Sequence, residues 1–190
     1  MKRLARRVFF LMLLSAAAAQ AQQPSRPPAM TDTATVSLDA LLQEERLLQF
    51  DRFDRDTAAA LGAALVARAR GASRPVTVEI RQGDAVLFAQ AMPGASPDHA
   101  DWIRRKNNLV RRTGHSSFYT HNQVRQAGGD HDALPGLDMR DYAAHGGAYP
   151  IVVRGQGAVG TVTASGLPGA DDHALVVAAL KDHLKMGEQP

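Results

Sequence analysis

Cysteine is absent from the 190 residues of this chain. Its absence excludes a disulfide-bonded scaffold, metal sites with cysteine ligands and a cysteine nucleophile. Aromatic residues make up only 5% of the sequence, and no apolar run reaches the roughly 20 residues that a membrane-spanning helix needs. We therefore expect a domain that is stabilised by its hydrophobic core alone, without a membrane anchor.

The first 21 residues hold an uneven share of the charge. They contain four of the chain's 22 Lys and Arg residues and none of its 19 Asp and Glu residues. An apolar run from Val8 to Leu14 follows the basic start, and small residues follow up to Ala21, which is the pattern of a secretory signal peptide. We expect cleavage after Ala21, with Ala19 as the second site, and export to the periplasm or the medium. Removal leaves 18 basic against 19 acidic residues, so the predicted mature chain is close to neutral, at −1.

The mature chain is predicted to begin with a tether and to continue as one domain. Residues 22–36 contain three prolines among small polar residues, without apolar periodicity, and are expected to be disordered. Residues 37–186 are long enough for a single domain of ordinary size. Periodicity predicts helices capped by Ser37, Asp54 and Ser96, a final helix over residues 170–186, a short extended connection at Phe50 and Phe53, and hairpins over residues 76–88 and 149–164.

Residues 115–147 are predicted to be a long loop with one or two helical turns. They contain five glycines and only short apolar groups, and loops of this length in compact domains are often functional. Because two hairpins supply antiparallel strands, a parallel nucleotide-binding sheet is not expected. The predicted fold is an α+β sandwich, with a mainly antiparallel sheet built from two hairpins and helices packed on it.

Three function classes are disfavoured by their missing patterns. The glycines at 155, 157 and 160 have the spacing GxGxxG, but a strand follows them, which favours a hairpin turn over dinucleotide binding. The near-neutral mature chain and its scattered aromatic residues argue against binding of nucleic acid. No GxSxG sequence marks a serine hydrolase.

The helix after Ser96 carries a charged side chain on its apolar face. Trp102, Ile103, Leu109 and Val110 form an apolar stripe, and Lys106 lies near its centre. Two interpretations remain open. The Lys106 stem packs on apolar surface while the amine reaches water, or the amine faces an internal cleft and meets an anionic ligand or a carboxylate. Arg104 or Arg105 would flank the amine in the second case.

Histidines raise the question of a metal or haem site. His173 shares the apolar face of the final helix and follows Asp172 directly. It is interpreted either as a functional residue or as a buried histidine that ties the start of the helix to a neighbouring carbonyl. The seven histidines form no HExxH motif and no helical i, i+4 pair. A solvated surface position is therefore the simpler interpretation for those in the predicted loop, although one axial histidine would suffice for non-covalent haem. They are His115, His121, His131 and His145.

Several short strings together resemble one known family. They are Trp102-Ile103-Arg104-Arg105-Lys106, Ser116-Ser117, His145-Gly146-Gly147 before Tyr149-Pro150-Ile151, then Gly160, Ser165-Gly166-Leu167 and Asp172-His173. Over about residues 37–184 the chain resembles the haem-degrading (HbpS/GlcG-like) domain family, most closely its uncharacterised bacterial subgroup with a Trp-Ile-Arg-Arg-Lys helix. The resemblance implies a profilin-like sandwich, self-association into dimers or rings and, in some members, binding and oxidative breakdown of haem in an extracellular sensing system.

The leading hypothesis is an exported domain that binds a small planar or anionic ligand in a cleft between the 102–106 helix face and the 145–147 loop. Non-covalent haem is the leading ligand, with His145 as the candidate iron ligand. The alternative is a non-catalytic oligomeric interaction module in which Lys106 and His173 form structural ion pairs, and a third possibility is an enzyme for oxidative breakdown of haem or another small molecule. The candidate ligand-binding residues are Trp102, Arg105, Lys106, His145, Gly146, Gly147, Asp172 and His173.

Overall fold

The computed structural model describes residues 36–72 and 74–185, so the predicted signal peptide and nearly all of the predicted tether lie outside the described residues. No helix in the described ranges is long and apolar enough to cross a membrane. The elements, in chain order, are α1 (Leu38–Leu47), β1 (Gln49–Phe50), α2 (Arg55–Ala69), β2 (Thr77–Gln82), β3 (Ala85–Ala91), α3 (His99–Thr113), α4 (Ser117–Gln126), β4 (Ala148–Val153), β5 (Gly157–Ser165) and α5 (Gly169–His183).

The strands form one five-stranded sheet in the order β1-β4-β5-β2-β3. The hairpins β2-β3 and β4-β5 are antiparallel, and β5 pairs antiparallel with β2. The predicted α+β fold with a mainly antiparallel sheet from two hairpins is therefore confirmed. The extended connection after α1 forms a further strand, because Gln49 and Phe50 pair parallel with Val152 and Val153.

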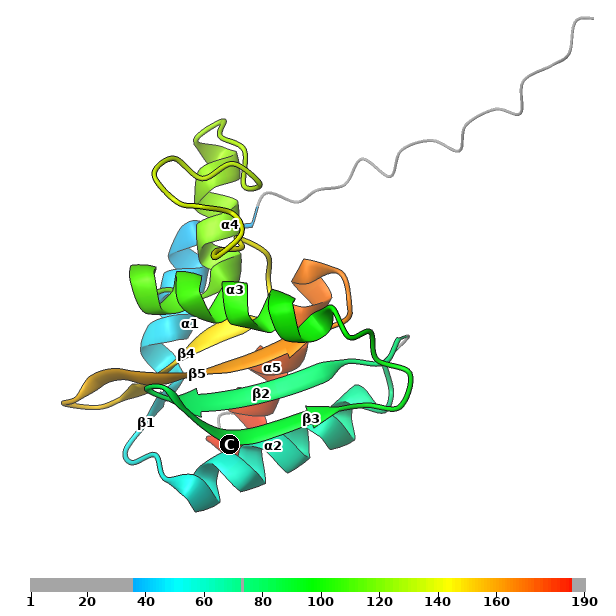
Figure 1. Cartoon of the computed structure of the whole chain (residues 1–190). Helices are drawn as coiled ribbons and strands as arrows, with labels where there is room; N and C mark the ends of the chain where they lie inside the picture. The colour runs from blue at the N-terminus through cyan, green and yellow to red at the C-terminus, as the bar shows by residue number, and fades with distance from the viewer. Residues whose placement is uncertain (1–35, 73, 186–190) are drawn as a thin grey trace, which may run out of the picture. The chain divides into compact units, whose positions relative to one another are not determined.

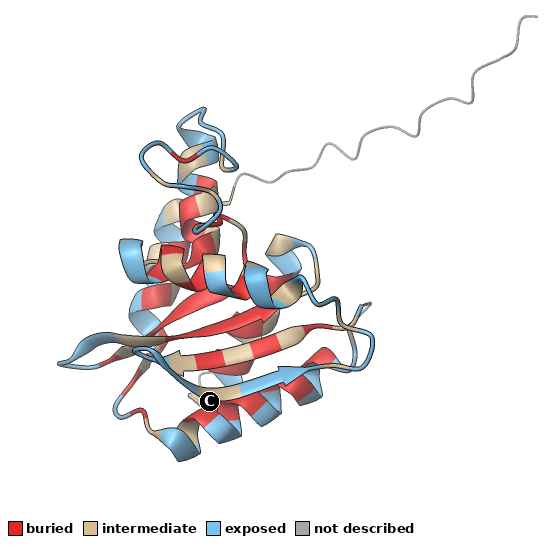
Figure 2. Ribbon diagram, in the orientation of Figure 1, coloured by how far each residue is buried: buried red, intermediate tan, exposed pale blue. Residues whose placement is uncertain are grey.

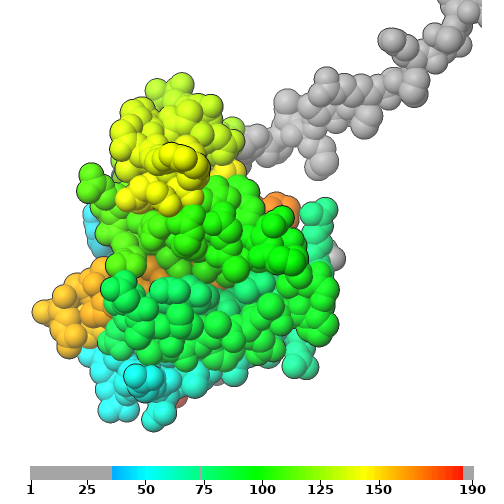
Figure 3. Space-filling model, in the orientation of Figure 1, coloured from blue at the N-terminus to red at the C-terminus, as the bar shows by residue number. Residues whose placement is uncertain are grey.

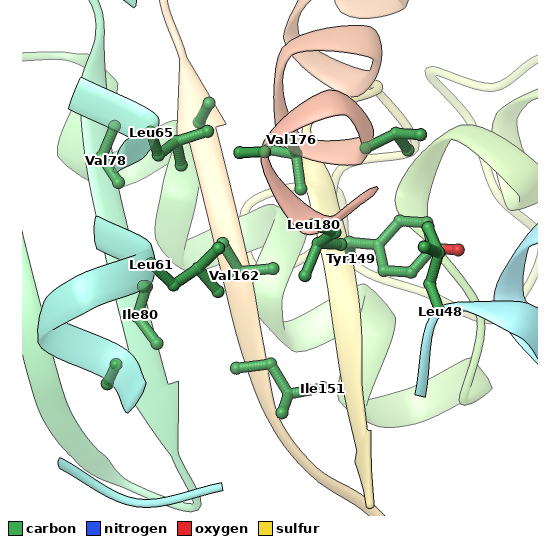
Figure 4. Close-up of a cluster of buried hydrophobic side chains, with 14 of the residues drawn as sticks. Leu48, Leu61, Leu65, Val78, Ile80, Tyr149, Ile151, Val162, Val176 and Leu180 are labelled. Carbon is green, nitrogen blue, oxygen red and sulfur yellow. The ribbon is translucent and has the colours of Figure 1, made fainter. Parts of the chain in front are cut away.

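Helices cover both faces of the sheet, with α2 and α5 on one face and α3 on the other (Figure 1). The main hydrophobic core lies on the α2 and α5 side. There Leu61 and Leu65 of α2 and Leu180 of α5 pack on Ile80 and Val162 (Figure 4). Ile80 and Val162 alternate along their strands with residues that face α3.

The face of the sheet under α3 is polar. Lys106 and Asn107 of α3 are buried against it, and buried residues line both helix and strands there (Figure 2). The Asn107 side-chain amide donates to Glu79 Oε1 at 2.9 Å, and the Thr163 hydroxyl donates to Asn107 Oδ1. A buried amide needs such partners, so the polar stripe of α3 matches the polar face of the sheet.

The segment 115–147 is more ordered than the sequence predicts. The prediction of one or two helical turns is wrong for Ser117–Gln126, which forms the ten-residue helix α4. Ser116 Oγ accepts from the Tyr119 backbone N–H and caps the helix. The helix buries Thr120 and Asn122 as well as Tyr119, and buried polar residues hide the apolar periodicity on which the prediction rested.

Residues 127–147 pack on a small cluster of their own. Leu134 and Ala144 are buried with Leu109 of α3. This segment, with α4, makes the green-to-yellow protrusion that lies against α3 in the space-filling view (Figure 3).

The start of α3 also differs from the prediction of a helix capped by Ser96. The helix begins at His99, and Ser96 Oγ accepts from the Asp98 N–H in the preceding turn.

Candidate ligand-binding pocket

A pocket of about 230 Å³ lies where the first turns of α3 and α5 meet the ends of the 145–147 and 165–167 segments. Helix N-termini carry a partial positive charge and favour anions. Five of the eight predicted site residues line this pocket: Trp102, Lys106, His145, Gly146 and Asp172. The other residues lining it are His99, Ser165, Gly166, Leu167 and Gly169.

Lys106 forms the floor of the pocket. Its side chain is 2% exposed, so the interpretation in which the amine reaches water is wrong. The Nζ atom donates to Ala164 O at 2.7 Å and Gly146 O at 3.2 Å, and lies 3.5 Å from Asp172 Oδ2. These three acceptors match the three N–H donors of an ammonium group. Burial lowers the pKa of Lys106 to about 8, against the opposing attraction of Asp172.

Asp172 is held from a second side by the chain that leads into α5. Its carboxylate accepts from the Gly166 N–H at 3.3 Å and the Leu167 N–H at 3.1 Å. Burial raises the pKa of Asp172, although Lys106 and the two backbone donors oppose the shift. The pair therefore joins α3, the end of β5 and the start of α5 beneath the pocket.

Gly147 and Gly146 allow this close packing. Gly147 has φ +118°, a backbone conformation that residues with a side chain rarely adopt. A Cβ there would lie 2.8 Å from Lys106 Nζ. A Cβ on Gly146 would clash with the carbonyl oxygen of Gly169 at the start of α5. Gly147 lies beside the Lys106 amine rather than among the residues that line the pocket.

Trp102 and His145 make an aromatic wall of the pocket. Their ring centroids are 5.0 Å apart and the rings meet edge to face at 78°. The Arg105 guanidinium lies 4.0 Å from the centroid of Trp102, and it donates to Asp101 Oδ2 at 2.8 Å. Arg105 therefore supports the indole ring but does not line the pocket.

His145 belongs at the same time to a group of histidines beside the pocket. The His121 and His131 ring centroids are 4.2 Å apart, and that of His145 is 5.2 Å from His131 and 6.1 Å from His121. These three histidines are half-buried and lie against one another at the surface. The His145 contact lowers the pKa of Asp132, and burial lowers the pKa of His121.

His173 lies outside the pocket. It is buried, and its ring stacks on Phe118 with centroids 4.6 Å apart. Its Nε2 is 3.4 Å from Glu44 Oε1 of α1, so the expected carbonyl partner is replaced by a carboxylate. The interaction links α5 to α1, which is a structural role for His173.

Two lining features were not among the predicted site residues, although Ser165-Gly166-Leu167 belongs to the strings that carry the family resemblance. His99, at the start of α3, places Nδ1 3.3 Å from Thr77 Oγ1 and borders the pocket. The connection from Ser165 to Gly169 supplies backbone atoms as well as lining residues. Its sequence, Gly166-Leu167-Pro168-Gly169 after a strand, is the signal of a tight connection into a helix that could have drawn attention to it.

The described residues form an α+β fold with a small polar site beside the N-termini of α3 and α5. Residues 53–181 match the model of the family described as "Haem degrading protein HbpS-like". The chain belongs to this family, which confirms the resemblance seen in its sequence.

Curated relatives match over most of their own length. A "UPF0303 protein" of Streptomyces avermitilis is 45% identical over 156 residues, covering 82% of this chain and 96% of the relative. A "UPF0303 protein" of Azotobacter vinelandii is 43% identical over 148 residues, covering 78% and 89%. The described domain is thus shared with these relatives nearly in full.

Solved structures show the same fold. The crystal structure of Ybr137w protein matches with a TM-score of 0.71 and 28% identity, covering 80% of this chain and 91% of that one. The crystal structure titled "PduOC:Heme Complex" matches with a TM-score of 0.56 and 22% identity, covering 67% and 94%. The second likeness is one of fold alone.

Proposed function

We propose that this chain is an exported protein that binds a small planar, anionic ligand, with non-covalent haem as the leading candidate. Membership of a family described as haem-degrading supports this proposal, as does a haem complex on the same fold. The observation that carries it is the pocket itself, where the Trp102 and His145 rings stand beside the N-termini of α3 and α5. A planar ring packs on such a wall, and a carboxylate is stabilised at such helix ends.

The residues present fit haem at one edge of the ring. Two imidazoles border the pocket, and each has one ring nitrogen engaged: His145 Nε2 at 2.8 Å from Asp132 Oδ1 and His99 Nδ1 near Thr77. The second nitrogen of His145, or of His99, would hold the iron. The volume of about 230 Å³ is below the roughly 300–1,000 Å³ of pockets that enclose drug-sized ligands. A ring as large as haem would therefore extend beyond the pocket.

Haem supplies an iron centre for oxygen and electron chemistry when it is bound. The residues of this chain bind and orient it. Trp102, supported by Arg105, packs against the ring, and the first turns of α3 and α5 attract the carboxylate. The Lys106 and Asp172 pair keeps the floor of the pocket in place without itself reaching solvent. We also propose that the chain self-associates and that it acts in sensing or in the breakdown of haem.

Titration of the purified chain with hemin, in the presence of a metal chelator, tests the proposal. We expect a saturable shift of the Soret band in the unaltered protein and in the control His183→Gln, which lies at the far end of α5. Trp102→Ala and the double variant His99→Ala/His145→Ala should weaken binding, with folding checked by circular dichroism. Absence of a shift, or a shift that these variants leave untouched, contradicts haem binding in this pocket.

One observation favours the alternative of a non-catalytic interaction module. All three acceptors of the Lys106 amine are protein groups, so this residue serves the fold directly. The alternative predicts a stable oligomer in size-exclusion chromatography with light scattering, together with no hemin binding. Hemin binding by a monomer would contradict it.

A further inference from the structure

Beside the pocket, three side chains have the composition of a metal site. One ligand atom each from His131, Asp132 and His145 lies within 4.8 Å of the other two. Asp132 Oδ1 is 2.8 Å from His145 Nε2, and Oδ2 is 3.7 Å from His131 Nε2. Metal–ligand bonds of about 2.0–2.2 Å in a tetrahedral site place ligand atoms roughly 3.3–3.5 Å apart. The two Asp132 distances lie on either side of that range.

The surrounding chain holds these ligands in position. Asp130 Oδ1 accepts from the Asp132 N–H at 2.8 Å, which fixes the turn that carries His131 and Asp132. His145 is held by its edge-to-face contact with Trp102. The intervening segment is tied to α3, where the Asn108 side-chain amide donates to Asp141 O at 2.9 Å. The two halves of the group, 13 residues apart, are therefore brought together by the fold.

A third imidazole lies against the group. His121 Nδ1 is 2.8 Å from Ala144 O, and since a carbonyl only accepts, the ring nitrogen donates and Nε2 keeps its lone pair. The same type of hydrogen bond orients imidazoles at metal sites. His121 thus adds a further nitrogen base next to His131.

Simple ion pairing does not explain this arrangement. The side chains of His131, Asp132 and His145 are 27%, 64% and 31% exposed, and ion pairs this open contribute only about 0–1 kcal/mol. One carboxylate serves several histidines that repel one another when protonated. Two imidazoles with a carboxylate are a donor set suited to divalent transition metals.

We propose that His131, Asp132 and His145 bind a divalent transition-metal ion of the zinc class, at the edge of the pocket. Three protein ligands leave one coordination position for water or a small anion. The ion replaces the direct contact between His145 Nε2 and Asp132. The site shares His145 with the pocket, whereas His131 and Asp132 do not line it.

Calorimetric titration of chelator-treated protein with Zn²⁺ tests this proposal, with Co²⁺ absorbance as a second readout. We expect one ion per chain, a visible Co²⁺ spectrum that Zn²⁺ removes, and no comparable binding of Mg²⁺. Loss of an outer partner of a metal ligand costs 10–100-fold in affinity, so His131→Ala/Asp132→Asn should weaken Zn²⁺ binding by about 100-fold or more. His183→Gln is the matched control and should bind as the unaltered protein does.

The proposal is overturned if Zn²⁺ binding is not saturable, or if His131→Ala/Asp132→Asn binds as tightly as His183→Gln. It is also overturned if Mg²⁺ competes equally, because that would indicate an unselective charge effect. The same double variant should keep its hemin response, so failure of the metal site and failure of haem binding give different results.

Discussion

Lys106 shows why a buried charge in this protein depends on its whole surroundings. Its amine meets two carbonyl oxygens and the Asp172 carboxylate, and Asp172 meets two backbone N–H groups in turn. Removal of one partner of a buried pair leaves the other charge without compensation, which is much costlier than loss of an exposed pair. The structural effect of Lys106 is thus to join three elements.

Lys106→Met should lower the free energy of unfolding by about 3 kcal/mol, measured by chemical denaturation. The variant leaves Asp172 and two carbonyl oxygens without their donor. Lys106→Met/Asp172→Asn should recover part of the loss, because the introduced amide is neutral and its oxygen still accepts from the Leu167 N–H. Lys181→Met, which breaks an exposed pair with Glu44, is the control and should cost no more than about 1 kcal/mol. Equal losses in the two lysine variants would refute the buried role.

The pH dependence of stability provides a second test of Lys106. Its pKa is about 8 in the folded chain and 10.5 in the unfolded one. Between these values the unfolded chain binds the extra proton, so the unfolding free energy rises with pH. The Lys106 contribution grows by up to about 3 kcal/mol across this window and is flat below it. Denaturation of the unaltered protein and Lys106→Met from pH 7 to above pH 10 should show a changing difference between the two; a constant difference contradicts the lowered pKa.

At the scale of elements, the start of α5 is packed unusually closely against the chain that leads into β4. Gly146 has no room for a side chain because the Gly169 carbonyl lies against its Cα. This contact holds the start of α5 against Gly146, and both Gly146 and Gly169 line the pocket. Close packing here therefore sets the shape of this side of the site.

Gly146→Ala should destabilise the fold by about 1–3 kcal/mol, the usual cost of overpacking, and should weaken hemin binding by shifting α5. Gly71→Ala is the matched control, since its nearest heavy atom would lie at an ordinary 3.6 Å. Surface changes of that kind stay within about 0.5 kcal/mol. Thermal unfolding followed by circular dichroism measures both, and a tolerated Gly146→Ala would show that α5 can move freely.

The proposed export concerns the whole molecule, and its prediction rests on the sequence of the first 21 residues. The protein recovered from the periplasm or the medium should begin at Gln22, or at Gln20 if the second site is used. Intact-mass measurement decides between the two. A protein that keeps Met1 and its basic N-terminal residues would contradict export through a cleaved signal.

Much of the fold follows from local pattern. The alternation in residues 76–88 and 149–164 predicts both hairpins, and helical spacing predicts α1, α2, α3 and α5. Helix α4 was not predicted because its buried side chains include Ser117, Thr120 and Asn122, which are polar and give no apolar periodicity. The pattern of α3 identified Lys106 as lying among apolar residues but gave no means of choosing its partner.

The sequence by itself determined the fold class, the absence of disulfide chemistry, and the residues from which the floor and the aromatic wall of the pocket are built. Only the tertiary structure decided which of them meet. Lys106 and Asp172 are 66 positions apart, and His131 and Asp132 reach His145 across an irregular segment. Periodicity indicates whether a side chain faces the interior, since that depends on its own helix or strand. It does not indicate which distant residue the side chain contacts, because such a contact depends on how whole elements pack.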